Sequence, residues 1–316
     1  MFWNIMLLII GFVFLIKGAD IFVDGASSIA GNFKISKMLI GLTIVAFGTS
    51  APEFAVSVQS LLSGNGDIVL GNVIGSNILN ILLILGVSSM FHSLNVKNNT
   101  VKKELPTTIL ITTLFIVLLS DSLFDNVAST FTRSDGIILL LFFMVFIYYL
   151  ISMARNKIEE DTEENYMPMM KAVLFTVGGI FAIVLGSDLV VQNASSLASH
   201  MGVSQKMISL TIIALGTSLP ELVTSVTATK KGEYDIAIGN VVGSNLFNLG
   251  VVIGLPVALF GGISKINFNS IDLIVMLISV ILLFLFSLND RKISKKEGFI
   301  LLALFIIYYG YIIFIG

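Results

Sequence analysis

The strongest constraint on the fold of this chain is an internal repeat at a fixed offset. Residues 18–86 align with residues 186–254 without a gap, and from Leu42 to Gly86 the two copies are identical at 22 of 45 positions. The shared tripeptides Gly-Thr-Ser, Gly-Asn-Val and Gly-Ser-Asn each recur 168 residues later, as does Pro-Glu. A match this long indicates a duplicated structural unit.

Composition places the repeat in a membrane. Of the 316 residues, 56% are hydrophobic and 12% are charged, whereas soluble domains are about 25% charged. The absence of cysteine and the presence of only two histidines exclude thiolate sites and histidine-rich metal centres. A net charge of −2 gives no sign of a nucleic-acid partner. We therefore expect an all-α polytopic membrane protein whose surroundings are the lipid bilayer.

Hydropathy predicts ten transmembrane helices. A hydrocarbon core of roughly 30 Å needs about 20 helical residues, so the two longest segments, the first and the sixth, should be tilted or bent. The predicted spans are 5–31, 38–62, 68–91, 106–122, 135–153, 169–199, 206–229, 236–260, 270–288 and 298–315.

Loop charges orient these spans. If both termini lie outside the cell membrane, the inside loops carry fourteen Lys and Arg residues and the outside loops carry Arg133, Lys206 and Lys265. This bias follows the positive-inside rule. We therefore expect a multi-pass cell-membrane protein with both termini outside.

The chain divides into two five-helix units, 1–153 and 169–316, which contain the duplicated segments 38–91 and 206–260. A cytoplasmic acidic segment, 154–168, joins them and is typical of a solvated linker. A calcium-sensing loop is the alternative, but the acidic run is short. Because each unit has an odd number of spans, the second is inverted, and matched residues meet near the midplane.

Two polar motifs interrupt apolar spans. Ala-Phe-Gly-Thr-Ser-Ala-Pro-Glu occupies 46–53 and Ala-Leu-Gly-Thr-Ser-Leu-Pro-Glu occupies 214–221. In each, proline removes the donor that the carbonyl of the glycine four residues earlier would use, so the helix should break at Gly-Thr-Ser. Freed carbonyls at this depth are tolerated where they line a cavity, and they are suitable ligands for sodium or calcium. A kink used only for packing is the alternative.

Glu53 and Glu221 fall near the middle of their spans. A charge there costs roughly 2.5–3.5 kcal/mol on insertion scales. The one embedded cation, Lys17, is matched by Leu185 in the other unit and offers no paired compensation. Two nearby carboxylates repel unless a cation lies between them. We therefore expect a cation site, the alternative being protonated, structural glutamates.

The Gly-Asn-x-x-Gly-Ser-Asn-x-x-Asn stretches at 71–80 and 239–248 supply further oxygens. Their Ser and last Asn lie four residues apart, on one helix face, while the glycines allow close approach to the broken helix. Asn77 and Asn245 lie one step round the helix, which favours packing. Asp20 and Asp188 also occupy matched positions. We interpret them either as partners in helix-to-helix hydrogen bonds or as cation entry groups.

These paired motifs resemble the α-repeats of the calcium/cation antiporter superfamily, and most closely its prokaryotic sodium/calcium exchanger branch. The resemblance implies ten helices in two inverted halves, with spans one and six as a sliding pair. It implies a secondary active antiporter, not an enzyme, that exchanges Na⁺ for Ca²⁺ by alternating access at a midplane site. With the charge of two carboxylates, it also suggests an electrogenic exchange of three Na⁺ for one Ca²⁺. A proton-coupled antiporter of Ca²⁺ or another divalent cation is the alternative.

Carried over by motif position, the resemblance implies a shared ion site, in which the ions are substrates and no cofactor or obligate protein partner is needed. The implied ligands are Glu53, Glu221, Thr49, Thr217, Ser50, Ser218, Ala46, Ala214, Ser76, Ser244, Asn80 and Asn248.

One departure and two rival functions bear on this interpretation. Some relatives carry Asp where this chain has Asn248, so the pocket has two acidic groups rather than three, which argues against a potassium requirement. A channel is disfavoured because deep carboxylates favour tight binding over rapid throughput. Gly64–Asp67 and Tyr234-Asp235 match the two signatures of intramembrane aspartyl proteases, but Asp67 and Asp235 are the same repeat position and inversion would separate them.

Overall fold

The computed structural model describes residues 1–121, 129–155, 166–203, 212, 214–264 and 269–314. These residues are mostly helical. The helices are α1 (Phe2–Phe33), α2 (Lys37–Ile40), α3 (Ala46–Thr49), α4 (Ala51–Leu62), α5 (Gly66–Leu79), α6 (Gly86–Phe91), α7 (Leu105–Leu118), α9 (Arg133–Arg155), α10 (Met169–His200), α12 (Ala214–Thr217), α13 (Leu219–Lys230), α14 (Tyr234–Phe247), α15 (Gly254–Phe260), α16 (Ser270–Leu288) and α17 (Lys295–Phe314). Four π-helical turns are η1 (Gly41–Val45), η2 (Asn80–Leu85), η3 (Thr100–Glu104) and η5 (Asn248–Ile253). Strands β1 (Leu94–Asn95) and β2 (Lys292–Ile293) pair antiparallel.

Among the described residues, seven helices are long and apolar enough to cross a membrane, and the bent pair Lys37–Thr49 and Ala51–Leu62 adds an eighth. The first, second, third, fifth, sixth, eighth, ninth and tenth predicted spans each overlap one of these. The fourth predicted span, 106–122, overlaps none of these helices. Its α-helix, α7, covers only Leu105–Leu118, and the π-helical turn η3 leads directly into it. In the seventh, 206–229, residues 206–211 and 213 lie outside the described residues.

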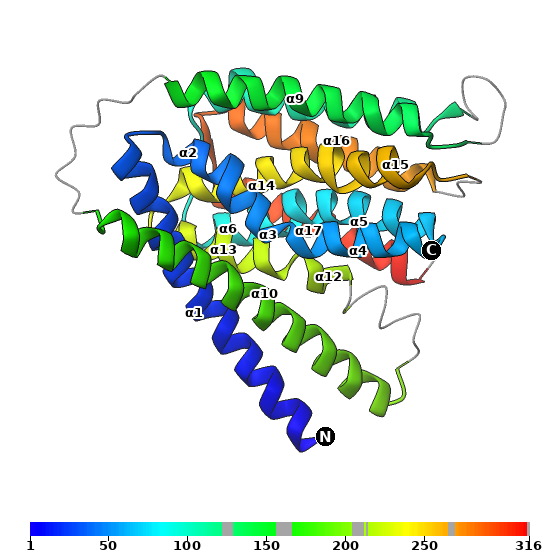
Figure 1. Ribbon diagram of the computed structural model, residues 1–316, viewed down its shortest axis with the longest axis horizontal. Coiled ribbons are helices and arrows are strands. Elements are labelled where there is room, and N and C mark those ends of the chain that lie inside the picture. The colour runs from blue at the N-terminus through cyan, green and yellow to red at the C-terminus, as the bar shows by residue number, and fades with distance from the viewer. Residues whose placement is uncertain (122–128, 156–165, 204–211, 213, 265–268, 315–316) are drawn as a thin grey trace.

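The helices form a stacked bundle with one separate pair. In Figure 1, α9, α16, α15, α5 and α4 run roughly parallel to one another, while α1 and α10 lie side by side and cross the bundle obliquely. The N-terminal end of α1 and the C-terminal end of α10 extend away from the stack. The longest predicted spans are therefore the pair that stands apart.

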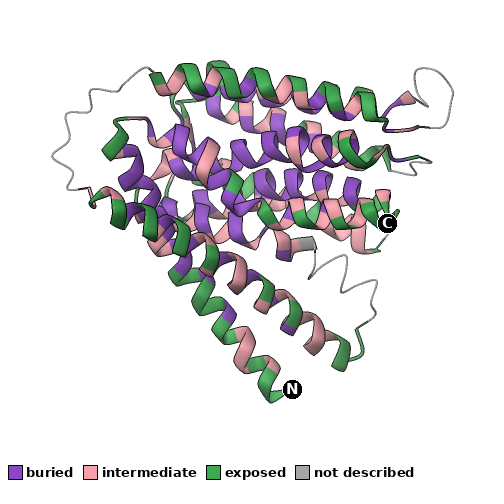
Figure 2. Ribbon diagram, viewed as in Figure 1, coloured by how far each residue is buried: buried purple, intermediate pink, exposed green. Residues whose placement is uncertain are grey.

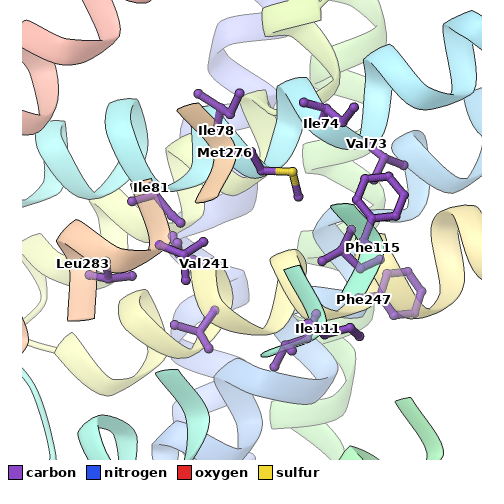
Figure 3. Close-up of a cluster of buried hydrophobic side chains, with 14 of the residues drawn as sticks. Val73, Ile74, Ile78, Ile81, Ile111, Phe115, Val241, Phe247, Met276 and Leu283 are labelled. Carbon is purple, nitrogen blue, oxygen red and sulfur yellow. The ribbon is translucent and has the colours of Figure 1, made fainter. Parts of the chain in front are cut away.

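Burial separates a protein-surrounded centre from an exposed periphery (Figure 2). In the most apolar stretch of each span, 72% of residues are buried in Gly66–Phe91 and 83% in Tyr234–Phe260, but only 17% in α9 and in α17. Apolar side chains of α5, α7, α14 and α16 pack between these central helices, as Val73, Phe115, Val241 and Met276 do in Figure 3. The two duplicated segments are therefore the core, and the outer helices present apolar residues to lipid.

The two copies of the repeat fold alike locally. After α4 and after α13 the chain turns at Gly64 (φ 76°) and Gly232 (φ 79°), which are matched positions in the left-handed region that favours glycine. Each turn leads to a 14-residue helix, α5 or α14, that continues into a π-helical turn, η2 or η5, beginning at the last Asn of the motif.

Small residues hold α1 and α10 in close contact. A Cβ atom added to Gly179 would lie 2.6 Å from the Cβ of Phe22 and 2.8 Å from its Cα, and one added to Gly11 would lie 2.9 Å from the carbonyl oxygen of Gly186. Neither backbone can give way cheaply at such distances. The pair is therefore packed as a single unit.

Gly179→Ala is expected to loosen this pair, since overpacking costs about 1–3 kcal/mol. The neighbouring Gly178→Ala is a matched control, because Gly178 is exposed and no described atom lies within 4 Å of its added Cβ. Thermal melting of the detergent-solubilised protein measures both. We expect a lower Tm for Gly179→Ala and an unchanged Tm for Gly178→Ala; equal melting of the two would contradict the packing.

Candidate cation-binding site

The structure breaks both motif helices where proline predicts. Ser50 (φ −84°, ψ 8°) separates α3 from α4, and the helical segments on its two sides, Lys37–Thr49 and Ala51–Leu62, are bent by 46°. Ser218 (φ −90°, ψ 4°) separates α12 from α13 in the same way. Pro52 and Pro220 lie in the first turns of α4 and α13, where a missing N–H is tolerated. The predicted interruption at Gly-Thr-Ser is confirmed.

One freed carbonyl connects the break to the separate helix pair. Pro220 removes the donor for the carbonyl of Gly216, and the hydroxyl of Ser187 on α10 donates to that oxygen at 2.8 Å. The matched position to Ser187 is Ala19, which has no hydroxyl. The two breaks are therefore not satisfied identically.

The two glutamates lie side by side in the interior. Glu53 and Glu221 are each 1% exposed and are close enough to repel electrostatically. Each is contacted by the serine of the other repeat, since Ser50 Oγ donates to Glu221 Oε1 at 2.8 Å and Ser218 Oγ lies 3.3 Å from Glu53 Oε1. The breaks thus cross-link the repeats, and motifs 168 residues apart form one cluster.

The second motif closes the cluster from α5 and α14. Ser76 Oγ lies 3.3 Å from Ser218 Oγ. Asn80 Nδ2 donates to Asn245 Oδ1 at 2.9 Å, and Asn245 Nδ2 donates to the carbonyl of Asn77 at 3.3 Å. Asn245 thus joins α14 to α5, which agrees with the packing interpretation of that residue.

Several oxygens of this cluster are buried without a hydrogen-bond partner among the described residues. They are Glu53 Oε2, Glu221 Oε2, Asn80 Oδ1, Asn248 Oδ1 and Ser244 Oγ. Buried polar atoms are normally paired, so a concentration of unpaired acceptors calls for a ligand. Carboxylate, amide and hydroxyl oxygens are the ligands that hard cations prefer. Chemically, an oxygen cluster of this kind suits Na⁺ or Ca²⁺.

The remaining predicted residues line the breaks. Thr49 is buried, and its hydroxyl lies 3.0 Å from Asn240 Oδ1. Thr217 interacts with Glu53. Ala46 is buried, but its carbonyl already accepts from Ser50 N at 3.0 Å. Ala214 is the first residue of α12, and its side chain lies outside the description.

Sequence reasoning missed Asn72 and Asn240, which support the carboxylate helices. Asn240 Nδ2 lies 2.9 Å from Ser225 Oγ and 3.4 Å from the carbonyl of Glu221. Asn72 Nδ2 lies 3.1 Å from Ser57 Oγ and 3.0 Å from the carbonyl of Glu53. Their identity in the repeated Gly-Asn-Val was the available signal.

The glycines of the second copy behave as predicted. A Cβ atom on Gly239 would lie 2.9 Å from the Cα of Gly41, and one on Gly243 would lie 2.8 Å from the Cα of Leu42. Helix α14 therefore crosses the broken helix almost backbone to backbone. For Gly71 the matched contact would involve Ser209, which lies outside the described residues.

The two matched aspartates have different surroundings. Lys231 Nζ lies 2.7 Å from Asp20 Oδ1, whereas Asp188 accepts from Gln192 of its own helix at 2.7 Å. Lys17 is exposed on α1 and does not neutralise the buried glutamates. Asp20 is thus an interhelical ion-pair partner, which agrees with the structural interpretation of that residue.

Two cavities lie away from this cluster. One of about 220 Å³ is lined by Lys97, Lys103, Glu104 and Tyr149 among others, and one of about 290 Å³ by Lys37, Lys97, Glu233 and Asp235 among others. Tyr149 donates to Glu104, Lys97 pairs with Asp235, and Lys37 pairs with Glu233 at 3.0 Å. The charges of Lys37, Lys97, Glu233 and Asp235 are therefore paired within the chain, and Asp235 is an ion-pair partner.

Comparison with known proteins identifies the family. The model of the sodium/calcium exchanger protein family matches residues 3–152 and 171–314. The chain is 40% identical over 317 residues to CaxA of Alkalimonas amylolytica, covering 97% of each chain. It is 31% identical over 338 residues to the sodium/calcium exchanger MaX1 of Methanosarcina acetivorans, covering 96% of each.

A solved structure agrees over the same length. The sodium-calcium exchanger NCX_Mj, soaked with 10 mM Na⁺ and zero Ca²⁺, superposes with a TM-score of 0.86 at 30% identity, covering 99% of both chains. The family is one of membrane exchangers rather than enzymes. The family match, the whole-length relatives and the buried oxygen cluster lead to one conclusion: this chain belongs to the sodium/calcium exchanger protein family.

Proposed function

We propose that this protein exchanges Na⁺ for Ca²⁺ across the cell membrane through the oxygen cluster around Glu53 and Glu221. The observation that carries the proposal is the set of unpaired buried oxygens on these two carboxylates and on Ser244, Asn80 and Asn248. One Ca²⁺ neutralises both carboxylates, and their repulsion opposes an empty site. Ser50, Ser218, Ser76, Thr49 and Thr217 would complete the ligand set, together with the carbonyls of Ala46 and Ala214.

Coupling follows from competition for the same carboxylates. The two charges are satisfied either by calcium or by sodium ions, so the two substrates exclude one another. An empty pair of anions in a low-dielectric interior is disfavoured, and the transition between states is therefore slow unless the site is occupied. Exchange, rather than leakage of either ion, is the result.

We further propose ten spans in two inverted five-helix units, with α1 and α10 as the moving pair. Their separation from the stack and their close mutual packing support rigid motion as one body. The lysine-rich loops that contain Lys37, Lys97 and Lys231 would face the cytoplasm, and both termini would lie outside. Alternating access is then a sliding of this pair past the fixed site.

The coupling ion is tested in proteoliposomes. Vesicles loaded with Na⁺ and diluted into Na⁺-free buffer should accumulate radioactive calcium, and vesicles with an acid interior and no Na⁺ should not. Uptake driven by the acid interior alone would instead assign the protein to proton-coupled exchange. No uptake under either gradient would exclude calcium as the substrate.

Exchange of three Na⁺ for one Ca²⁺ moves one net charge per cycle, and each charge is worth about 2.3 kcal/mol per 100 mV of membrane potential. We therefore expect the ion gradients at which net calcium flux is zero to shift with voltage clamped by potassium and valinomycin. A flux balance that does not move with voltage would refute electrogenic exchange.

A further inference from the structure

At one end of the molecule, α1 is tied by charge to the turn between α13 and α14. Lys231 Nζ lies 2.7 Å from Asp20 Oδ1 and 2.6 Å from Asp24 Oδ1, and it also donates to the carbonyl of Asp20 at 2.8 Å. Asp20 and Asp24 are one helical turn apart and so present both carboxylates on one face of α1. One lysine of the core thus contacts two acids of the separate helix pair.

Glu233, two residues further on, forms a second tie. Ser27 Oγ of α1 donates to Glu233 Oε1 at 2.8 Å, and Lys37 Nζ of α2 lies 3.0 Å from the same oxygen. Lys37 orients the carboxylate from within the stack, and Ser27 contacts it from α1. We refer to Lys231 with Asp20 and Asp24, and Glu233 with Ser27, as the α1 latch.

The latch lies over an apolar seal. Ala228, Ile236 and Ala237 are 0% exposed and pack with Val23 and Ala26 of α1. The opposite ends of α1 and α10 extend away from the stack (Figure 1). The latch therefore lies at the end at which α1 meets the core.

The inverted counterpart of the latch lacks its charges. At the offset of 168, Lys231 is matched by Ser63, Glu233 by Asn65 and Asp24 by Gln192, so the same ion pairs have no equivalent. Gln192 donates to Asp188 of its own helix at 2.7 Å. Ser195, which matches Ser27, has a buried hydroxyl without a hydrogen-bond partner among the described residues. The repeat is symmetric at the ion site and asymmetric here.

We propose that the residues of the α1 latch are positioning residues that stabilise closure at the lysine-rich end, and so bias the exchanger toward the state whose site opens at the opposite end. The proposal rests on the proposed function for the meaning of the two states. Breaking the latch shifts the balance toward opening at the lysine-rich end, and the residues at the matched positions, Ser63, Asn65 and Gln192, carry no charge that would resist the converse movement.

The absence of cysteine allows single-cysteine reporters in the full chain. Ala228→Cys reports on the buried seal, and Ser60→Cys, at the matched position and partly exposed, reports on the opposite end. Maleimide modification of each reporter is measured in membranes, without an ion gradient. Each reporter is combined with Lys231→Met, with the conservative Lys231→Arg, or with Lys230→Met, a control that removes the same charge from the adjacent residue.

We expect Lys231→Met to raise the modification rate of Ala228→Cys about two- to fivefold, as for the loss of exposed ion pairs, and to lower that of Ser60→Cys. Lys231→Arg and Lys230→Met should leave both rates near the parent. Asp20→Asn combined with Asp24→Asn, which removes the other side of the pairs, should reproduce Lys231→Met.

Unchanged rates in Lys231→Met, or a rise at both reporters together, would overturn the latch, because the second pattern indicates general loosening. Equal effects of Lys230→Met and Lys231→Met would also overturn it. Failure of the proposed function is separate: a parent protein that shows no sodium-driven calcium uptake, but whose reporters shift in opposite directions, retains the latch and loses the assigned ions.

Discussion

Glu221→Gln is expected to reduce sodium-driven calcium uptake by at least about 100-fold, and Glu53→Gln by a similar factor. Each change keeps the side-chain volume and can still accept a hydrogen bond from Ser50 or Ser218. Each removes one of the two charges that a cation would neutralise. Removing one partner of a buried ion pair, here the carboxylate that faces the bound cation, costs about 3–5 kcal/mol. The measurement is the initial rate of radioactive calcium uptake into sodium-loaded proteoliposomes.

Glu104→Gln is the matched control for this change. Glu104 is 0% exposed, as deeply buried as the site glutamates, and one of its oxygens likewise has no hydrogen-bond partner among the described residues, but it lies outside the cluster and accepts from Tyr149. Uptake by Glu104→Gln should stay within about twofold of the parent, because this change can affect uptake only through a modest loss of protein stability. Retention of most uptake by Glu221→Gln, or equal loss in Glu104→Gln, would show that burial rather than ion binding explains these carboxylates.

Asn240→Leu is expected to impair both stability and exchange. Asn240 is 0% exposed and lies within hydrogen-bonding distance of Thr49, Ser225 and the carbonyl of Glu221. Leu has a similar volume but leaves these groups unpaired, at about 1–3 kcal/mol for each buried polar group. We expect a lower Tm in detergent and a fall in calcium uptake of about tenfold or more.

Asn72, which occupies the position matched to Asn240 in the first repeat, serves as the comparison. Asn72 makes the corresponding hydrogen bonds to Ser57 and the carbonyl of Glu53, but it is only partly buried, whereas Asn240 is 0% exposed. Asn72→Leu should therefore impair uptake less than Asn240→Leu does. A larger effect of Asn72→Leu would contradict the greater cost assigned to the fully buried Asn240.

The sequence was sufficient for those parts of the site that depend on local chemistry. Proline four residues after glycine predicted both breaks, because the lost donor has the same effect in any helix. The buried glutamates stood out because a charge in an apolar span needs compensation. Their crosswise contacts with Ser50 and Ser218 could not be predicted, since they depend on how the two repeats face one another.

Other features depend on tertiary structure and left weaker signals. The π-helical turns that begin at Asn80 and Asn248 have the same apolar pattern as ordinary helix, so periodicity does not distinguish them. Lys231 counted only as a loop charge that oriented the spans. Its partners on α1, more than 200 residues away in sequence, became visible only in the folded chain.

Competition between Ca²⁺ and Na⁺ for the purified protein tests the central claim most directly. We predict that calorimetric titration of the detergent-solubilised parent shows calcium binding that weakens steeply as Na⁺ is raised, because both ions use Glu53 and Glu221. Glu221→Gln should abolish this binding, and Glu104→Gln should preserve it. Calcium binding that is indifferent to Na⁺, or that survives the loss of Glu221, would contradict a single shared site.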